Sequence, residues 1–229
     1  MTDPEALAAL TAVVIACRRC PRLVEWRERV TREKVKRFRD ETYWGRPVPG
    51  FGDPEARILL VGLAPAAHGG NRTGRVFTGD ASGDFLFRQM HEVGLANQAL
   101  SRRADDGLRL IDAYVAAAVR CAPPANRPLP SERDNCAPYL ARELEILEGV
   151  RVLVALGAYA WEAAFRAIAA VTGDDARPRP RFGHAAEAAA GGYRVVGSYH
   201  PSQQNTNTGR LTPAMLREAL ERARALSAG

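Results

Sequence analysis

The sequence predicts a three-layer α/β/α fold around a central, mainly parallel sheet of four strands. Four short runs at residues 58–61, 113–119, 150–157 and 193–199 are rich in valine, leucine and alanine and have the length of buried strands. A segment in which apolar residues recur at helical spacing follows each run. Strands that alternate with helices form a parallel sheet that helices cover on both faces.

The expected helices cover residues 3–16, 85–93, 131–147 and 158–172, and a last helix begins near residue 212. Three of them have typical N-terminal signals, which are Thr2 or Asp3 with Pro4, then Ser131, then Thr212 with Pro213. Residues 18–39 are rich in arginine and lysine and are interpreted as a further helix. That helix presents either a solvated, ion-paired face or a surface for nucleic acid.

Composition sets the class of protein. The 229 residues fit a single domain, residues 1–229, with a sizeable core. No apolar run approaches the roughly 20 residues of a membrane-spanning helix. The first residues carry acids and no basic leader, so a cytoplasmic protein is expected. The net charge of +6 favours an anionic partner, nucleic acid first, over a membrane.

The chain has four cysteines, Cys17, Cys20, Cys121 and Cys136. The first two form a C-x-x-C motif, and the others follow the second expected strand. Disulfides are rare in the cytosol, so a metal centre is the leading interpretation. Four thiolates can hold a zinc ion or a cubane iron–sulphur cluster, and the spacing does not choose between them. The alternative is four unrelated buried thiols.

Residues 57–84 contain the candidate site. An apolar strand ends at Gly62, a polar loop rich in glycine follows, and a helical pattern begins after Asp84. Active sites in α/β folds lie at the carboxyl ends of strands, in loops of this kind. The loop is long for a spacer inside a compact domain, which favours a functional loop.

Several motifs occur in order along almost the whole chain. They are Gly62-Leu63-Ala64-Pro65-Ala66, His68-Gly69, Asn71-Arg72-Thr73-Gly74-Arg75, Phe77-Thr78-Gly79-Asp80 and His200-Pro201-Ser202. Together they resemble the motifs of family 5 uracil-DNA glycosylases (the UDGb type), which belong to the uracil-DNA glycosylase superfamily. The four cysteines are similar to the ligands of the [4Fe-4S] cluster in families 4 and 5. The resemblance therefore implies that cluster as the cofactor, in preference to zinc.

Two departures from the wider superfamily favour family 5. Family 4 members carry an acidic residue where this chain has Leu63, and leucine cannot activate water. Many superfamily members use an asparagine at the end of the second strand to read uracil, where this chain has alanines at residues 116–118. Both differences imply a pocket that is less strict about its base.

Hydrolysis of an N-glycosidic bond needs donors for the leaving base, an anion near the sugar and an ordered water. His200 is the candidate donor, and Asp80 is the candidate carboxylate, with Asp84 as the competing choice. Phe77 is expected to stack on the flipped base, its alternative role being core packing. The backbone of Gly62, Leu63 and Ala64 and the amide of Asn126 complete the predicted base pocket.

The predicted DNA contacts come from two loops. Arg72 and Arg75 of the glycine-rich loop are expected to bind phosphates. Ser202, Asn205, Asn207 and Arg210 of the loop after the last strand are expected to bind phosphates and sugars. Leu211 is the candidate apolar wedge in the minor groove.

These residues lead to two hypotheses of different class. The first is a monofunctional glycosylase, expected to be a monomer, which excises uracil, hypoxanthine and xanthine from double-stranded DNA by base flipping. The second is a non-catalytic metal-cluster module that binds nucleic acid, and the missing acid at Leu63 keeps it open. An electron-transfer protein is a remote third.

Overall fold

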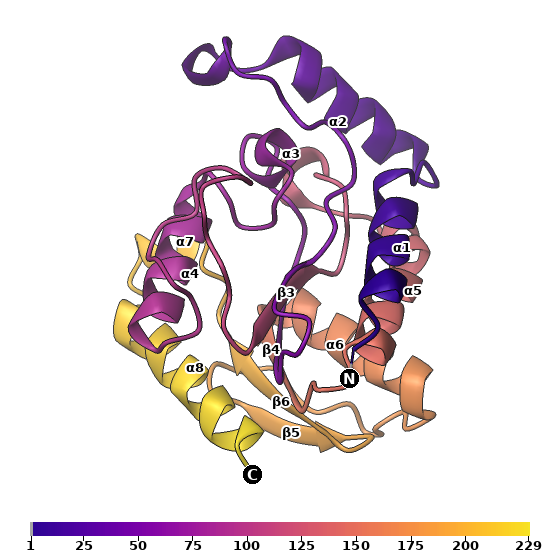
Figure 1. The fold of residues 1–229 in the computed structure, drawn as a ribbon, viewed down its shortest axis with the longest axis vertical. Helices are drawn as coiled ribbons and strands as arrows, with labels where there is room; N and C mark the ends of the chain where they lie inside the picture. The colour runs from indigo at the N-terminus through magenta and orange to yellow at the C-terminus, as the bar shows by residue number, and fades with distance from the viewer. Residues whose placement is uncertain (1) are drawn as a thin grey trace.

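The computed structural model describes residues 2–229 and contains one mixed sheet with the strand order β1-β3-β2-β4-β6-β5 (Figure 1). The four central strands are β3 (Ala113–Ala117), β2 (Ile58–Gly62), β4 (Val152–Leu156) and β6 (Tyr193–Ser198). They pair in parallel, as the sequence predicts. The α/β fold class is therefore confirmed.

The sheet has six strands and not the predicted four. The edge strands β1 (Phe51–Gly52) and β5 (Glu187–Ala190) each pair antiparallel, with β3 and β6 respectively. Sequence patterns missed β1 because it has two residues in a Gly/Pro-rich stretch. They missed β5 because its sequence, Glu-Ala-Ala-Ala, has helical rather than strand propensity.

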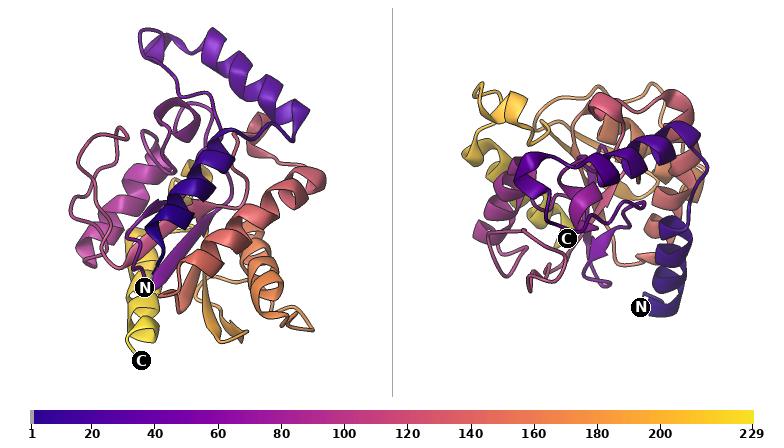
Figure 2. Two further views of the ribbon diagram at one scale, coloured as in Figure 1. Left: turned by 45° about the vertical axis from the view of Figure 1, so that its right-hand side comes forward. Right: turned by 90° about the horizontal axis from the view of Figure 1, so that it is seen from above.

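Helices cover both faces of the sheet. The helices α4 (Ala81–Glu92) and α8 (Pro213–Ser227) pack on one face, and α5 (Pro130–Ile146) and α6 (Ala158–Thr172) on the other (Figures 1 and 2). Side chains of each strand alternate between the two cores, so that Leu60 faces α4 and α8 whereas Leu59 and Val61 face α5 and α6. The core thus fixes the register of every central strand.

The N-terminal helices lie outside this sandwich. The helix α1 (Pro4–Ile15) begins at the predicted cap Asp3, whose Oδ1 accepts the N–H groups of Glu5 and Ala6. It contacts α5, and α2 (Pro21–Glu33) contacts the short helix α3 (Gly70–Thr73) (Figure 1). The basic helix ends at Glu33, and residues 36–38 form a 3₁₀ turn, η1 (Lys36–Phe38), so it is shorter than predicted.

The start of α5 differs from the prediction of Ser131 as its cap. Leu129 occupies the N-cap and Pro130 is the first helical residue. The Glu132 carboxylate accepts the N–H of Leu129 at 2.7 Å and pairs with Arg22. Proline is well suited to the first helical position, so the cap lies two residues earlier than predicted.

Two further short helices, η2 (Pro124–Asn126) and α7 (Gln203–Thr206), lie in the loops after β3 and β6. Across residues 2–229 no helix is long and apolar enough to cross a membrane.

Candidate active site

Three of the predicted residues meet where β2 and β6 end. The rings of Phe77 and His200 lie with their centroids 5.8 Å apart and their planes tilted by 37°. A Cβ atom on Gly62 would lie 2.7 Å from the Phe77 ring, which is closer than packed carbon atoms approach. The glycine at the end of β2 therefore leaves the space in which the Phe77 ring lies.

His200 lies close to Gly157 and accepts a hydrogen bond from Asn205. Its Cβ lies 3.3 Å from the position that a Cβ on Gly157 would take, just after β4. The side-chain amide of Asn205 donates to its carbonyl oxygen at 2.9 Å. Burial lowers the pKa of His200 to about 4, so its imidazole is neutral at physiological pH. A neutral imidazole carries one N–H and can donate one hydrogen bond to a base oxygen.

Phe77 adopts a backbone conformation that is unfavourable for an aromatic residue, with φ of +52°. Its carbonyl group packs so closely on Gly83, in the first turn of α4, that a Cβ there would overlap it. Strained residues of this kind persist when the surrounding structure holds them, and they cluster at functional sites. The close packing of the Phe77 backbone on Gly83 of α4 thus holds the Phe77 ring at the strand ends.

Asp80 is the N-cap of α4, and its Oδ1 accepts the N–H of Gly83 at 2.9 Å. Its carboxylate lies where a Cβ of Gly69 would otherwise be. Burial raises the pKa of Asp80, while hydrogen bonds from the N–H groups of Gly83 and Ser82 oppose that rise. Asp84 follows in the first turn of the helix, as predicted.

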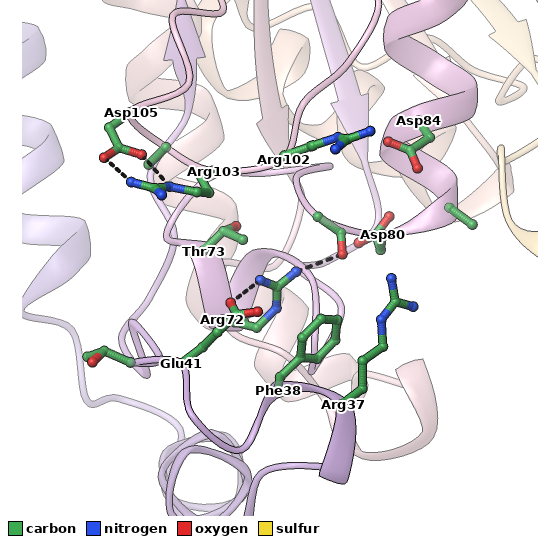
Figure 3. A pocket seen from close by; sticks show the side chains of 14 residues that line it. Arg37, Phe38, Glu41, Arg72, Thr73, Asp80, Asp84, Arg102, Arg103 and Asp105 are labelled. Atoms are coloured by element: carbon green, nitrogen blue, oxygen red, sulfur yellow. Dashed lines mark hydrogen bonds and ion pairs between the residues drawn. The ribbon is translucent and has the colours of Figure 1, made fainter.

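Both carboxylates line an open cavity between η1, α3, the start of α4 and the loop at residues 102–105, which we call the Asp80 cavity (Figure 3). The arginines that line it are Arg37, Arg72, Arg102 and Arg103. Arg37 and Arg102 are exposed, and no carboxylate of residues 2–229 lies within ion-pair distance of either. The cavity therefore offers free cations beside the candidate catalytic carboxylate.

Arg72 and Arg75 are not free to bind phosphates, which corrects the prediction. Arg72 is buried, pairs with Glu41, and donates to the carbonyl oxygens of His68 and Gly79. Arg75 is also buried and its guanidinium donates to Asp106 at 2.8 Å. These arginines fasten the glycine-rich loop to its neighbours.

The loop after β6 also differs from the prediction. Leu211 is completely buried in the core and cannot act as a wedge in the minor groove. Its position just before α8 makes it a core contact. The Asn205 side-chain amide donates a hydrogen bond to the carbonyl oxygen of His200 within the protein, and Ser202 precedes α7 as its N-cap. Asn207 and Arg210 are exposed, as a DNA contact requires.

Asn126 is exposed in η2 and has a positive φ of +55°. Its backbone N–H donates to Pro123. No described contact joins its side chain to Phe77 or His200, so its predicted place in the base pocket stays a prediction. Leu63 and Ala64 are half-buried directly after β2, and the Leu63 carbonyl accepts the N–H of Val119.

The four cysteines come together although they are far apart in sequence. Cys17 and Cys20 lie between α1 and α2, Cys121 follows β3, and Cys136 lies in α5. All four line one small cavity, which we call the cysteine cavity, and all are free of disulfides. A buried ion pair between Arg120 and Glu143 joins the segment of Cys121 to α5. Across residues 2–229 no three His, Cys, Asp or Glu side chains are arranged to hold a single metal ion.

Two positions were missed by sequence reasoning. The hydroxyl of Tyr43 lies 3.0 Å from Nδ1 of His68, which ties the segment before β1 to the glycine-rich loop. Arg27 is buried on the inner face of α2 with Leu23 and Val30. The spacing of Arg27 from these apolar residues, four before and three after, was a signal that it lies on the buried face.

Comparisons with known proteins identify the class. Residues 49–224 match the family model described as the uracil DNA glycosylase superfamily. The chain is 54% identical over 220 residues to a type-5 uracil-DNA glycosylase of Thermus thermophilus, covering 96% of this chain and 97% of that protein. It is 50% identical over 224 residues to the type-5 enzyme of Mycobacterium bovis, covering 97% and 82%.

Type-4 uracil-DNA glycosylases are more distant. The one from Archaeoglobus fulgidus is 34% identical over 114 residues, which is 49% of each chain. The chain belongs to the uracil-DNA glycosylase superfamily, and within it to the type-5 family. It is accordingly a DNA glycosylase, and its substrate is DNA.

The contact between Gly62 and Phe77 generates a first prediction. Gly62→Ala should reduce excision of uracil strongly while the protein stays folded, because the added Cβ displaces the Phe77 ring. Gly183→Ala is the matched control, since a Cβ there meets its nearest neighbour at an ordinary 3.7 Å. Single-turnover excision rates and circular dichroism measure the two effects. Equal rates for Gly62→Ala and the wild type would contradict the assigned position of the ring.

Burial of His200 generates a prediction about pH. The folded-state pKa of about 4 is below the unfolded value of 6.5, so the unfolded chain binds the proton first as the pH falls. Its contribution to stability is therefore complete above pH 6.5 and declines toward pH 4, by at most about 3 kcal/mol. Urea unfolding between pH 7 and about 4 should show the wild type losing stability relative to His200→Gln. Equal losses of stability in the wild type and in His200→Gln as the pH falls would contradict the low pKa of His200.

Proposed function

We propose that this protein hydrolyses the N-glycosidic bond of uracil in double-stranded DNA, and also those of hypoxanthine and xanthine. The target base is flipped out of the duplex and bound beside Phe77 and His200, at the ends of β2 and β6. The observation that carries the proposal is the tilted arrangement of Phe77 and His200 at the strand ends. It combines the phenyl ring of Phe77, on which a base can stack, with the imidazole of His200, which can donate a hydrogen bond to a base oxygen.

His200 is suited to help the base leave. As the bond breaks, negative charge develops on the base, and a donor aimed at a base oxygen stabilises it. The low pKa of His200 means that the imidazole donates a hydrogen bond as a neutral group and does not transfer a proton at neutral pH. Loss of one such donor typically costs about 3 kcal/mol in the transition state.

Asp80 is suited to act at the sugar. Positive charge develops there, and a carboxylate can stabilise it while orienting the attacking water. Asp80 is three residues from Phe77 and is held by the first turn of α4, which fixes the direction of its carboxylate. Leu63 offers no carboxylate at the end of β2, and Asp80 is the carboxylate proposed to take that role.

The scarcity of amines supports a monofunctional reaction. A glycosylase that also cleaves the strand needs an amine nucleophile, most often lysine. The chain has two lysines, Lys34 and Lys36. The ammonium of Lys34 donates to the carbonyl oxygens of Arg39 and Glu41. Water is therefore the proposed nucleophile.

We also propose that the four cysteines hold a [4Fe-4S] cluster. Two observations support the fit. The first is that the four cysteines line one cavity although they are far apart in sequence. Four thiolates around one cavity are the ligand set that a cubane cluster requires. The second observation is the buried cation Arg27 beside Cys121, which requires an anion. When bound, the cluster would tie α1 and α2 to β3 and α5.

A panel of oligonucleotides tests the proposed activity. Duplexes with uracil, hypoxanthine or xanthine are incubated with the protein and then treated with alkali. Strand breakage only after alkali is expected for all three, because a monofunctional enzyme leaves an abasic site. Intact strands would instead favour a non-catalytic module that binds nucleic acid, and breakage without alkali would contradict the monofunctional reaction.

Asp80→Asn should slow single-turnover excision by a large factor for every base while DNA affinity stays nearly unchanged. Asp84→Asn is the matched control, since Asp84 lines the same cavity one helical turn away. A full rate for Asp80→Asn together with an inactive Asp84→Asn would move the water-orienting role to Asp84.

The proposed cluster predicts a brown protein with about four iron atoms and about four acid-labile sulphides per chain. Cys121→Ala should lose iron and solubility before it loses any particular catalytic step. Iron analysis and the visible spectrum of anaerobically purified protein measure the content. One zinc and no iron would contradict the assignment.

A further inference from the structure

Buried arginines in this protein have carboxylate partners, with one exception. Among residues 2–229, the buried arginines are Arg27, Arg72, Arg75 and Arg120. The last three pair with Glu41, Asp106 and Glu143 respectively. No carboxylate of the described residues lies within ion-pair distance of Arg27, although it is only 2% exposed. An unpaired buried charge costs several kcal/mol, so a missing anion is indicated.

The surroundings of Arg27 show where that anion would lie. Its Nη1 donates to Sγ of Cys121 at 2.9 Å, and both terminal nitrogens lie 3.3 Å from the carbonyl oxygen of Cys17. Its Nε has no partner. The guanidinium therefore faces the cysteine cavity, which it lines.

Two other cations at the cysteine cavity differ from Arg27, because neither is both buried and without a carboxylate partner. Arg19 and Arg120 also line the cavity. Arg120 is neutralised by Glu143, and Arg19 is exposed with its guanidinium over the ring of Tyr139. Arg27 is therefore the buried cation at the cysteine cavity that has no carboxylate partner among residues 2–229.

We propose that Arg27 is the counter-cation of the iron–sulphur cluster and donates a hydrogen bond to its Cys121 ligand. The inference rests on the proposed four-cysteine cluster and concerns a positioning residue, not a catalytic one. A cluster with four thiolate ligands has a net negative charge, which increases when the cluster is reduced. A buried cation and an N–H···S bond therefore stabilise the reduced form more than the oxidised form, and they raise the reduction potential.

The test compares Arg27→Met with Arg32→Met in the full-length protein. Both changes remove one positive charge from α2, but Arg32 is exposed and contacts no cysteine. Reduction potentials are measured by voltammetry, and iron is measured per chain before and after incubation with a chelator. Arg27→Met should have a more negative potential than the wild type, or lose iron to the chelator faster, with an unchanged circular dichroism spectrum. Arg32→Met should resemble the wild type in both measurements.

Further variants separate charge from the hydrogen bond. Arg27→Lys keeps the charge and should lie between the wild type and Arg27→Met. If Arg27→Met is insoluble, Arg27→Gln replaces it under the same criteria. An unchanged potential and unchanged iron retention would overturn the proposal, as would an equal shift in Arg32→Met, which would indicate long-range charge alone. A wild-type protein without iron would instead refute the cluster itself.

Discussion

The parallel register of β3, β2, β4 and β6 is the constraint on which the rest of the structure depends. Parallel strands end at the same edge of a sheet, so Gly62, Gly157 and His200 lie near one another although they are separated by up to 138 residues of chain. The two cores fix this register, because a slip by one residue would turn every buried side chain toward the wrong face. The glycines at this edge then leave room for Phe77 and His200.

Buried polar groups hold the loops at this edge, in addition to the apolar packing of Val76 and Phe77. Arg75 joins the glycine-rich loop to Asp106, and Arg120 joins the end of β3 to Glu143 of α5. Breaking such a pair leaves an uncompensated buried charge and costs about 3–5 kcal/mol. Fixed loops suit catalysis, since donors act best when they are aligned before the charge develops. Arg27 is proposed to hold the cysteine segments in the same way, through its hydrogen bonds to Cys121 and Cys17.

Sequence patterns predicted the four central strands because each is a short, continuous apolar run between turn residues. They also predicted that Phe77 and His200 would share a site, through the motifs that contain them. They failed for Arg75 and Leu211, since a basic residue in a glycine-rich loop and an apolar residue in a polar loop both look exposed. Burial of Arg75 depends on Asp106, which lies 31 residues away, and local patterns carry no information about that distance.

The central claim is that the flipped base is bound against Phe77 and His200 at the end of β2. The most direct measurement is a crystal structure of the protein with duplex DNA that contains 2′-fluoro-2′-deoxyuridine, a substrate analogue that resists hydrolysis. The account predicts that the uracil ring stacks on Phe77, that a ring nitrogen of His200 lies within hydrogen-bond distance of a uracil oxygen, and that Asp80 faces the sugar. A uracil that stays stacked in the duplex, or that binds away from Phe77 and His200, would contradict it.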